Sequence, residues 1–210
     1  PAASRCPSSV VPYLQDRGID PEIIRLCLEF GILYESRRYQ NCVFVGRDLA
    51  GRPRSASLRG TRDSFKLDAA GSDKRYAFCL PASDPACPRL AVAESPIDAL
   101  SLATLEKRNG GPWQACHYLS LGGTAPNALL QFLRNHPAVN QISLCLDNDK
   151  AGLVGMERLE QAVRDDPALA AQVTLLCRNL PPAEYGKDYN EFLTALVRMA
   201  RGQQRGREAR

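Results

Sequence analysis

Long hydrophobic runs are missing from this sequence. No stretch approaches the roughly 20 apolar residues that a membrane-spanning helix needs, and no secretory signal is visible. We therefore expect no membrane segment. A strong charge imbalance is missing too, since a net charge of +4 over 210 residues says little about partners. A chain of this length can bury a substantial core, in one large or two small domains.

Zinc-type cysteine spacing is also missing. None of the eight cysteines forms a C-x-x-C pair, and His117 and His136 have no ligand-like spacing to any cysteine. We therefore expect no zinc site. Five cysteines lie inside or beside apolar runs, as free buried thiols do: Cys27, Cys42, Cys79, Cys145 and Cys177. This usage predicts reduced thiols in a cytoplasmic protein.

Short apolar runs alternate with helical segments in the second part of the chain. The predicted strands are residues 90–93, 116–121, 142–146 and 172–177, and the helices between them include 126–135 and 151–163. Alternation at this spacing predicts an α/β fold, with a parallel sheet of about four strands flanked by helices.

The first part of the chain predicts a smaller α+β lobe. Asp20 and Pro21 have the residue types of a helix start, and residues 41–46 and 55–58 are predicted to form a β-hairpin. A proline-containing connector at 84–88 indicates a domain boundary. We expect an N-terminal lobe at 1–86, a second domain at 87–200, and a disordered basic tail at 201–210, which lacks apolar anchors.

Acidic residues follow two of the predicted strands. Glu94 comes directly after residues 90–93, and Asp147 and Asp149 follow residues 142–146. If both strands lie in one parallel sheet, these acids meet at its carboxyl edge, where open α/β sheets hold ligands. Clustered carboxylates repel one another, and a divalent cation such as Mg²⁺ relieves that repulsion. Asp98 could join this site, or it could only stabilise the first turn of a helix.

Basic residues are concentrated between Arg37 and Arg75, where ten basic residues face four acidic ones. One interpretation is a solvated surface with scattered arginines. The other is a groove lined with phosphate-binding groups. The residues that we single out as candidates to bind nucleotide or DNA are Arg59, Lys66 and Lys74.

Several short motifs resemble one family, the Toprim domain. Residues 94–98 (ESPID) stand where primases of this family have E-G-Y-x-D, and residues 147–152 (DNDKAG) are similar to their D-G-D-x-A-G. Residues 186–191 (GKDYNE) resemble G-K-D-P-D-E. Two further likenesses are S-L-G-T at residues 120–124 and Y-L-x-x-R-G-I at residues 13–19. The motifs resemble, in order, the catalytic core of bacterial DnaG-type primases, in the form found in primase-like Toprim proteins of plasmids and mobile elements.

This resemblance implies metal-dependent nucleotidyl transfer that makes short primers on single-stranded DNA. Glu94, Asp147 and Asp149 would be catalytic, and with Asp98 they would bind Mg²⁺ or Mn²⁺. Lys187 would join Arg59, Lys66 and Lys74 in binding nucleoside triphosphates or template. A helicase or a relaxase is an implied partner, in plasmid or mobile-element replication or transfer. Two alternatives stay open: a Toprim nuclease using the same acids, and a non-catalytic nucleic-acid-binding module of a larger mobilisation protein.

Overall fold

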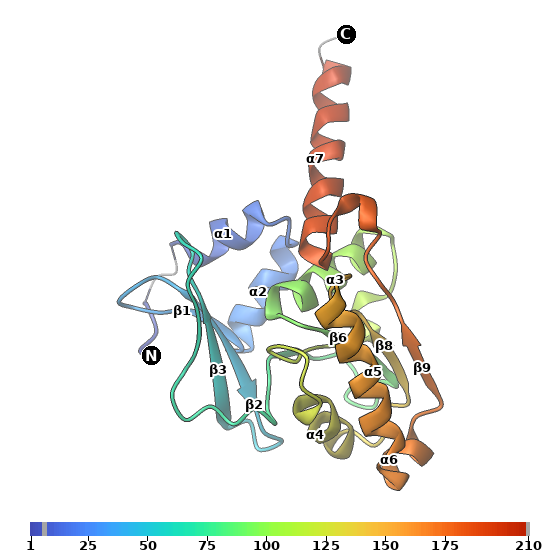
Figure 1. Cartoon of the computed structure of the whole chain (residues 1–210). Helices are drawn as coiled ribbons and strands as arrows, with labels where there is room; N and C mark the ends of the chain where they lie inside the picture. The colour runs from blue at the N-terminus through green and yellow to red at the C-terminus, as the bar shows by residue number, and fades with distance from the viewer. Residues whose placement is uncertain (6–7, 209–210) are drawn as a thin grey trace.

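Two β-sheets lie side by side in the molecule, with helices packed around them (Figure 1). The computed structural model describes residues 1–5 and 8–208, with side chains as far as residue 203. The first sheet has the strand order β1-β2-β3-β4, and the second has the order β5-β7-β6-β8-β9. The predicted α/β class, with a mainly parallel sheet, is confirmed.

The first sheet is antiparallel. Its strands are β1 (Leu33–Glu35), β2 (Cys42–Arg47), β3 (Pro53–Arg59) and β4 (Lys66–Asp68). Cys42 lies opposite Arg59 in the β2–β3 pair, which confirms the predicted hairpin. Strand β3 also pairs with β4, where Lys66 lies opposite Arg59. The β3–β4 pair therefore places two cationic residues next to each other.

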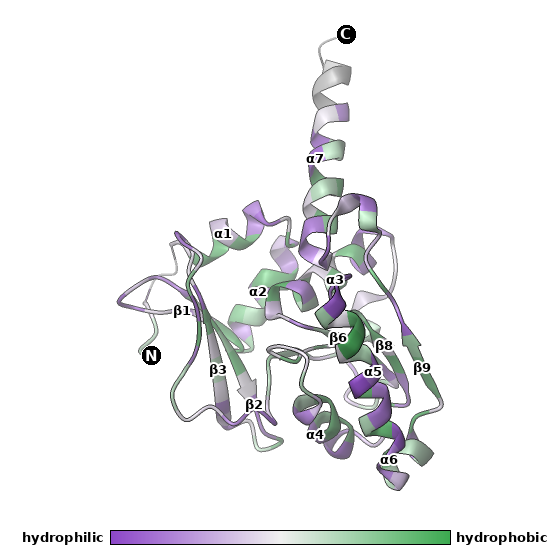
Figure 2. Ribbon diagram, in the orientation of Figure 1, coloured by the Kyte–Doolittle hydropathy of each residue, from purple (hydrophilic) through white to green (hydrophobic). Residues whose placement is uncertain are grey.

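Two helices pack against this sheet. Helix α1 is Val10–Asp16, and α2 is Pro21–Glu29. Asp20 caps α2 by accepting a hydrogen bond from the Glu22 amide, as the residue types predict. Figure 2 shows hydrophobic residues along α2 and β2, in keeping with an apolar interface between helix and sheet.

The second sheet is parallel except at one edge. Its strands are β5 (Cys79–Leu80), β6 (Arg89–Ala93), β7 (His117–Ser120), β8 (Gln141–Leu144) and β9 (Leu175–Arg178). Strand β6 lies between β7 and β8, and only β5 pairs antiparallel. Consequently the loops after β6 and β8 leave the same edge of the sheet, side by side.

Helices cover both faces of the second sheet. Ala91 and Ala93 of β6 pack on one face with α3 (Pro96–Arg108) and α7 (Tyr189–Glu208). Leu90 and Val92 pack on the other face, against three helices and the residues around them. Those helices are α4 (Asn127–Asn135), α5 (Lys150–Arg164) and α6 (Pro167–Gln172), and two short 3₁₀ turns lie at Trp113–Ala115 and Ala183–Tyr185. A strand that is buried on both faces has a continuous apolar sequence, as residues 90–93 of β6 do.

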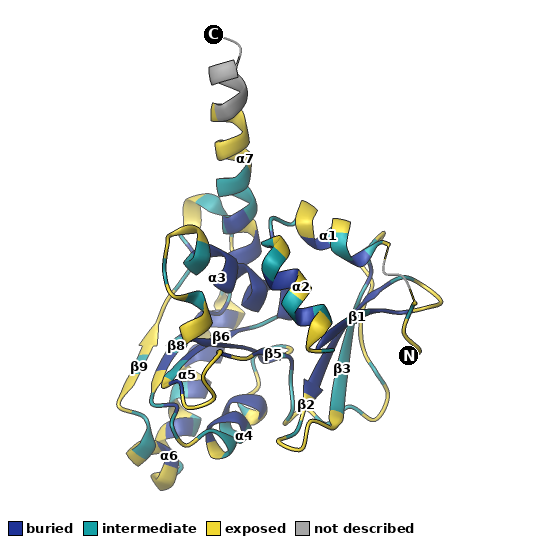
Figure 3. Ribbon diagram, turned by 180° about the vertical axis from the view of Figure 1, so that it is seen from behind, coloured by how far each residue is buried: buried dark blue, intermediate teal, exposed yellow. Residues whose placement is uncertain are grey.

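One hydrophobic cluster joins the two lobes. Ile23 of α2 and Phe44 of β2 belong to the same cluster as Leu100 of α3 and Leu193 of α7. Figure 3 shows buried segments in β2 and α2 of the first lobe and in α3, β5 and β6 of the second. The strand β5, which the predicted boundary at residue 86 assigns to the first lobe, is an edge strand of the second sheet.

The C-terminal part differs from the prediction. Residues 201–208 continue α7, where the sequence predicts disorder, and residues 209–210 lie outside the described residues. Arg, Gln and Glu favour helix well enough to extend a helix whose first turns are packed on the core. Strand β9 begins at Leu175, later than predicted, because residues 167–172 form α6, which Asp166 caps.

The seven described cysteines are all free thiols. Cys27, Cys42 and Cys145 are buried as predicted and Cys79 is partly buried, whereas Cys177 is exposed because β9 is an edge strand. Within the described part of the chain, we find no helix that combines the length and the apolar character needed to cross a bilayer.

Candidate active site

Glu94 and Asp147 lie next to each other at the carboxyl edge of the parallel sheet. Glu94 follows β6 directly, and the chain after β8 runs on beside β6, with the Cys145 amide 2.7 Å from the Val92 carbonyl oxygen. The Asp147 amide then donates to Glu94 Oε1 over 3.3 Å. Residues 53 positions apart in the sequence therefore share one hydrogen bond, at the place predicted from the strand pattern.

Asp149 opens helix α5. Its Oδ1 accepts a hydrogen bond from the Gly152 amide at 3.0 Å, which leaves Oδ2 facing the loop that carries Lys187. Gly152 is needed here because a Cβ would collide with the Asp147 carbonyl oxygen. The bond from Gly152 is the main reason why the pKa of Asp149 lies below its usual value. Asp149 is therefore an anion with a fixed orientation.

Burial acts in the opposite direction on the other two acids. It raises the pKa of Glu94, and the neighbouring Asp147 charge raises it further. Burial also raises the pKa of Asp147, although the ammonium of Lys187 partly offsets this. Carboxyl groups with raised pKa values, gathered in a cleft, are typical of sites that move protons or hold cations.

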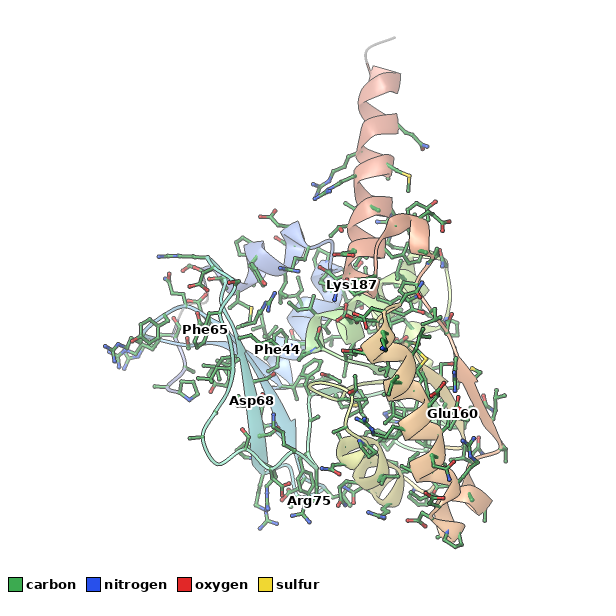
Figure 4. All side chains as sticks on the ribbon, viewed as in Figure 1. Phe44, Phe65, Asp68, Arg75, Glu160 and Lys187 are labelled. Atoms are coloured by element: carbon green, nitrogen blue, oxygen red, sulfur yellow. The ribbon has the colours of Figure 1, made fainter. Side chains whose placement is uncertain are left out.

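Lys187 lies on the two aspartates. Its Nζ is 3.3 Å from Asp147 Oδ2 and 3.4 Å from Asp149 Oδ2. The side chain reaches them from the loop just before α7, where Figure 4 labels it above α5. The family resemblance implies that Lys187 binds phosphate. In this structure its ammonium forms ion pairs with Asp147 and Asp149.

Asp98 is buried and held by protein groups. It is only 7% exposed, its Oδ1 accepts from the Asn190 amide at 3.1 Å, and its Oδ2 accepts from the Ser95 hydroxyl at 2.5 Å. Burial, followed by the charge of Asp188, raises its pKa to about 7. Asp98 thus lies at the junction of α3 and α7 with both carboxylate oxygens hydrogen-bonded, and the charge of nearby Asp147 also contributes to its raised pKa.

Asn190 extends this junction to the first lobe. Its side chain accepts from Arg17 Nη1 at 2.9 Å and donates to the Arg17 carbonyl oxygen and to Ser101 Oγ. Arg17 also stacks over the Tyr13 ring, 5.0 Å from its centroid. Helices α1, α3 and α7 are therefore joined by one hydrogen-bonded network beside the acids.

A cleft of about 650 Å³ separates the acids from a cationic wall. Glu94, Asp147 and Lys187 line one side of it. Arg59 and Lys66, from the paired strands β3 and β4, line the other. Arg59 Nε is buried without a hydrogen-bond partner, so this guanidinium has donor capacity left for a ligand.

Lys74 does not line this cleft. It forms an ion pair with Asp68, which Figure 4 labels on the first-sheet side, and lies in a smaller pocket beside Ser72 and Tyr76. Of the four predicted phosphate-binding residues, only Arg59 and Lys66 therefore form the wall opposite the acids.

Two cleft residues escape the sequence-based site list. Arg17 is the arginine of the Y-L-x-x-R-G-I stretch, so that motif contains the signal that could have identified it. Asp188 follows Lys187 in the GKDYNE motif; it accepts a hydrogen bond from the Glu191 amide and also lines the cleft. Its charge acts on Asp98 and Asp147, which adds a further carboxylate to this wall.

Two family models match the chain. Residues 12–85 match a family described as a protein of unknown function (DUF3991), and residues 91–193 match the Toprim-like family. The second lobe is a Toprim-like domain. An uncharacterized protein of Bacillus anthracis, pXO2-78, is 30% identical in an alignment of 159 residues that covers 70% of this chain and 44% of that protein. The chain thus spans less than half the length of this curated relative.

Solved primase structures share the fold of this Toprim-like chain. The DnaG catalytic core has a TM-score of 0.58 at 19% identity, over 94% of this chain and 73% of that one. The primase fragment of the bacteriophage T7 primase-helicase protein has a TM-score of 0.57 at 20% identity, over 84% of this chain and 66% of that one. A DnaG primase catalytic domain bound to single-stranded DNA has a TM-score of 0.54 at 18% identity, over 94% and 71%. The likeness covers the basic lobe as well as the Toprim-like domain.

Proposed function

We propose that the cleft is the active site of a primase-like nucleotidyltransferase that makes short primers on single-stranded DNA with Mg²⁺ or Mn²⁺. The observation that carries this proposal is the opposition of charges across one cleft: Glu94 and Asp147 on one wall, Arg59 and Lys66 on the other. Such a cleft suits a reaction that needs a cation near the reacting phosphate and positive charge along the phosphate backbone.

The donor set suits a hard divalent cation. Glu94, Asp147 and Asp149 offer only carboxylate oxygens, the ligand type that Mg²⁺ prefers. The Lys187 ammonium already lies between the two aspartates, so this position favours positive charge. Among the described residues no three such side chains are gathered tightly enough to hold a metal. Binding would therefore require the carboxylates to turn toward a common point.

A bound divalent ion would offset the charge on the attacking and leaving oxygens of an in-line phosphoryl displacement. Glu94 is suited to accept the proton of a primer 3′-hydroxyl, because its raised pKa brings it closer to that of a useful base. Arg59 would bind triphosphate or template phosphates through its planar, multiply donating guanidinium. Lys66 and Arg17 would add charge along the same groove.

Related structures agree with these ligands. A DnaG primase catalytic domain has been solved bound to single-stranded DNA, and primase domains of two T7 gp4 subunits occur in a complex of T7 lagging-strand DNA polymerase with an RNA/DNA hybrid and dTTP. The Bacillus anthracis relative is a plasmid protein, which agrees with a role in plasmid or mobile-element replication or transfer. A cytoplasmic location and a helicase or relaxase partner form part of this proposal.

One assay tests the proposal against its rivals. The chain is incubated with a single-stranded template, labelled ribonucleotides and Mg²⁺ or Mn²⁺, beside an Asp147→Asn variant. Short labelled oligomers that the variant fails to make support primer synthesis. Nicking of a supercoiled plasmid in the same buffer, without oligomers, would support the nuclease instead. Salt-sensitive DNA binding that survives in the variant, with neither activity, would support a binding module.

A further inference from the structure

The loop that carries Lys187 is fixed to the loop that carries the aspartates. The Asn148 amide donates to the Lys187 carbonyl oxygen over 2.6 Å, and the Asn148 side chain donates to the Pro181 carbonyl oxygen over 3.3 Å. The Lys187 amide donates to Glu191 Oε2 over 2.7 Å. The backbone of Lys187 is therefore held on both sides.

The Lys187 side chain, by contrast, is 56% exposed, and among the described residues the ion pairs of its ammonium are those with Asp147 and Asp149. A flexible four-carbon arm on a fixed base can leave the aspartates without any change in the fold. The arm also lines the cleft that contains Arg59 and Lys66. Its ammonium can therefore occupy two positions: beside Asp147 and Asp149, or in the cleft, where a ligand would bind.

The position of the ammonium conflicts with that of a divalent ion. Mg²⁺ binds carboxylate oxygens at roughly 2.0–2.1 Å. An ion on the Oδ2 atoms of Asp147 and Asp149 would compete for the oxygens that lie 3.3 and 3.4 Å from the Lys187 ammonium. Two cations a few ångströms apart repel each other strongly in a partly buried site.

We propose that Lys187 is a resident counter-ion that a divalent cation displaces, and that the displaced ammonium then binds the anionic ligand in the cleft. The inference rests on the proposed divalent-ion site at Asp147 and Asp149. It assigns Lys187 a positioning role: the residue keeps the carboxylates paired without metal and couples metal binding to phosphate binding. Metal and polyphosphate therefore assist each other through one side chain.

Mn²⁺ binding to the full chain tests the first half of this inference, by electron paramagnetic resonance or calorimetry. Lys187→Met removes the competitor. If the ammonium occupies the aspartates for 80–90% of the time, the variant binds Mn²⁺ about five to ten times more tightly than wild type. Lys187→Arg, which keeps a cation in reach of the acids, should not tighten binding.

A matched control separates contact from general charge. Lys150 is an exposed lysine next to Asp149, at the first position of α5. Lys150→Met removes the same charge near the site without removing a bridge to both aspartates, so it should change Mn²⁺ affinity much less than Lys187→Met. Equal affinities for the two variants, or weaker binding by Lys187→Met, would overturn the inference.

Inorganic triphosphate tests the second half. At saturating Mn²⁺, Lys187→Met should bind triphosphate several-fold more weakly than wild type, although it binds Mn²⁺ more tightly. If Lys187 only stabilised the loop, its removal would weaken the binding of both Mn²⁺ and triphosphate. Tighter Mn²⁺ binding together with weaker triphosphate binding is therefore the result that indicates displacement. Unchanged triphosphate affinity would overturn the coupling.

Asp147→Asn distinguishes failure of this inference from failure of the proposed function. If wild type binds no Mn²⁺, the divalent-ion site fails and the inference fails with it. If wild type binds Mn²⁺, Asp147→Asn does not, and Lys187→Met gains no affinity, then the metal site stands and only the displacement role is overturned.

Discussion

The two walls of the cleft are built in different ways. The acids follow buried parallel strands, and backbone amides orient them: the Asp147 amide contacts Glu94, and the Gly152 amide contacts Asp149. The cationic wall comes from strands β3 and β4 of an antiparallel sheet, where Lys66 is exposed and Arg59 keeps an unpaired Nε. One wall is preorganised by backbone hydrogen bonds, although its carboxylates must still turn toward a common point to hold a cation, whereas the other can adapt to a flexible strand.

The strongest test of this comparison is Glu94→Gln. If the preorganised wall carries the chemistry, primer synthesis should fall by about 100-fold or more, because a proton acceptor and an anionic ligand are lost together. The wild-type rate should fall as pH drops below the raised pKa of Glu94, since the base must be deprotonated. The variant should lack that acid limb in a pH–rate profile. If Glu94→Gln still showed a fall in rate at low pH, another group would be the proton acceptor.

Replacing Asp98 sharpens the comparison, because this acid lines the cleft and also joins α3 to α7 through its hydrogen bond from the Asn190 amide. Asp98→Ala leaves the buried Asn190 amide without its acceptor, and we expect a loss of about 1–3 kcal/mol of unfolding free energy. Urea denaturation measures this loss. A stability equal to wild type would mean that Asp98 is not a junction between α3 and α7.

The pH dependence of stability gives a second measure of Asp98. Its folded pKa of about 7 exceeds the usual aspartate value of 3.8, so the folded state binds the proton more tightly than the unfolded chain does. This group should therefore make the protein less stable as pH rises from about 4 to about 7. Asp98→Asn should flatten that part of the profile, and an unchanged slope would contradict the assignment.

The smallest expected effect concerns the adaptable wall. Arg59→Ala should weaken single-stranded DNA binding by up to about tenfold at low salt, and reduce the salt slope by about one. Lys74→Ala is the matched control, because Lys74 does not line the cleft and its charge is already paired with Asp68. Fluorescence anisotropy at several salt concentrations separates the two. Equal effects would mean that DNA follows the outer face of the first sheet rather than the cleft.

The strand-end acids could be predicted because their position depends on chain direction alone. Glu94 and Asp147 each follow an apolar run, and parallel strands end at one edge. The position of Asp98 could not be predicted in the same way. Its burial depends on α7 packing across α3, a contact between segments about 90 residues apart, which no local pattern encodes.

Side-chain partners of the basic residues were the least predictable part. Lys74 and Lys187 look alike in the sequence, yet one pairs with Asp68 and the other with Asp147 and Asp149. Long flexible side chains choose among nearby acids according to tertiary placement. Arg17 likewise reaches the cleft only because its helix packs beside Asn190.

The apolar cluster common to both sheets has a consequence for how this chain can be divided. Phe44 and Ile23 belong to the segment that matches one family model, and Leu100 and Leu193 to the segment that matches the other. Separating the two segments would expose a hydrophobic patch on each fragment to water and make the fragments prone to aggregation. We therefore expect the two matched segments to unfold together, and engineering that transplants one should carry the other with it.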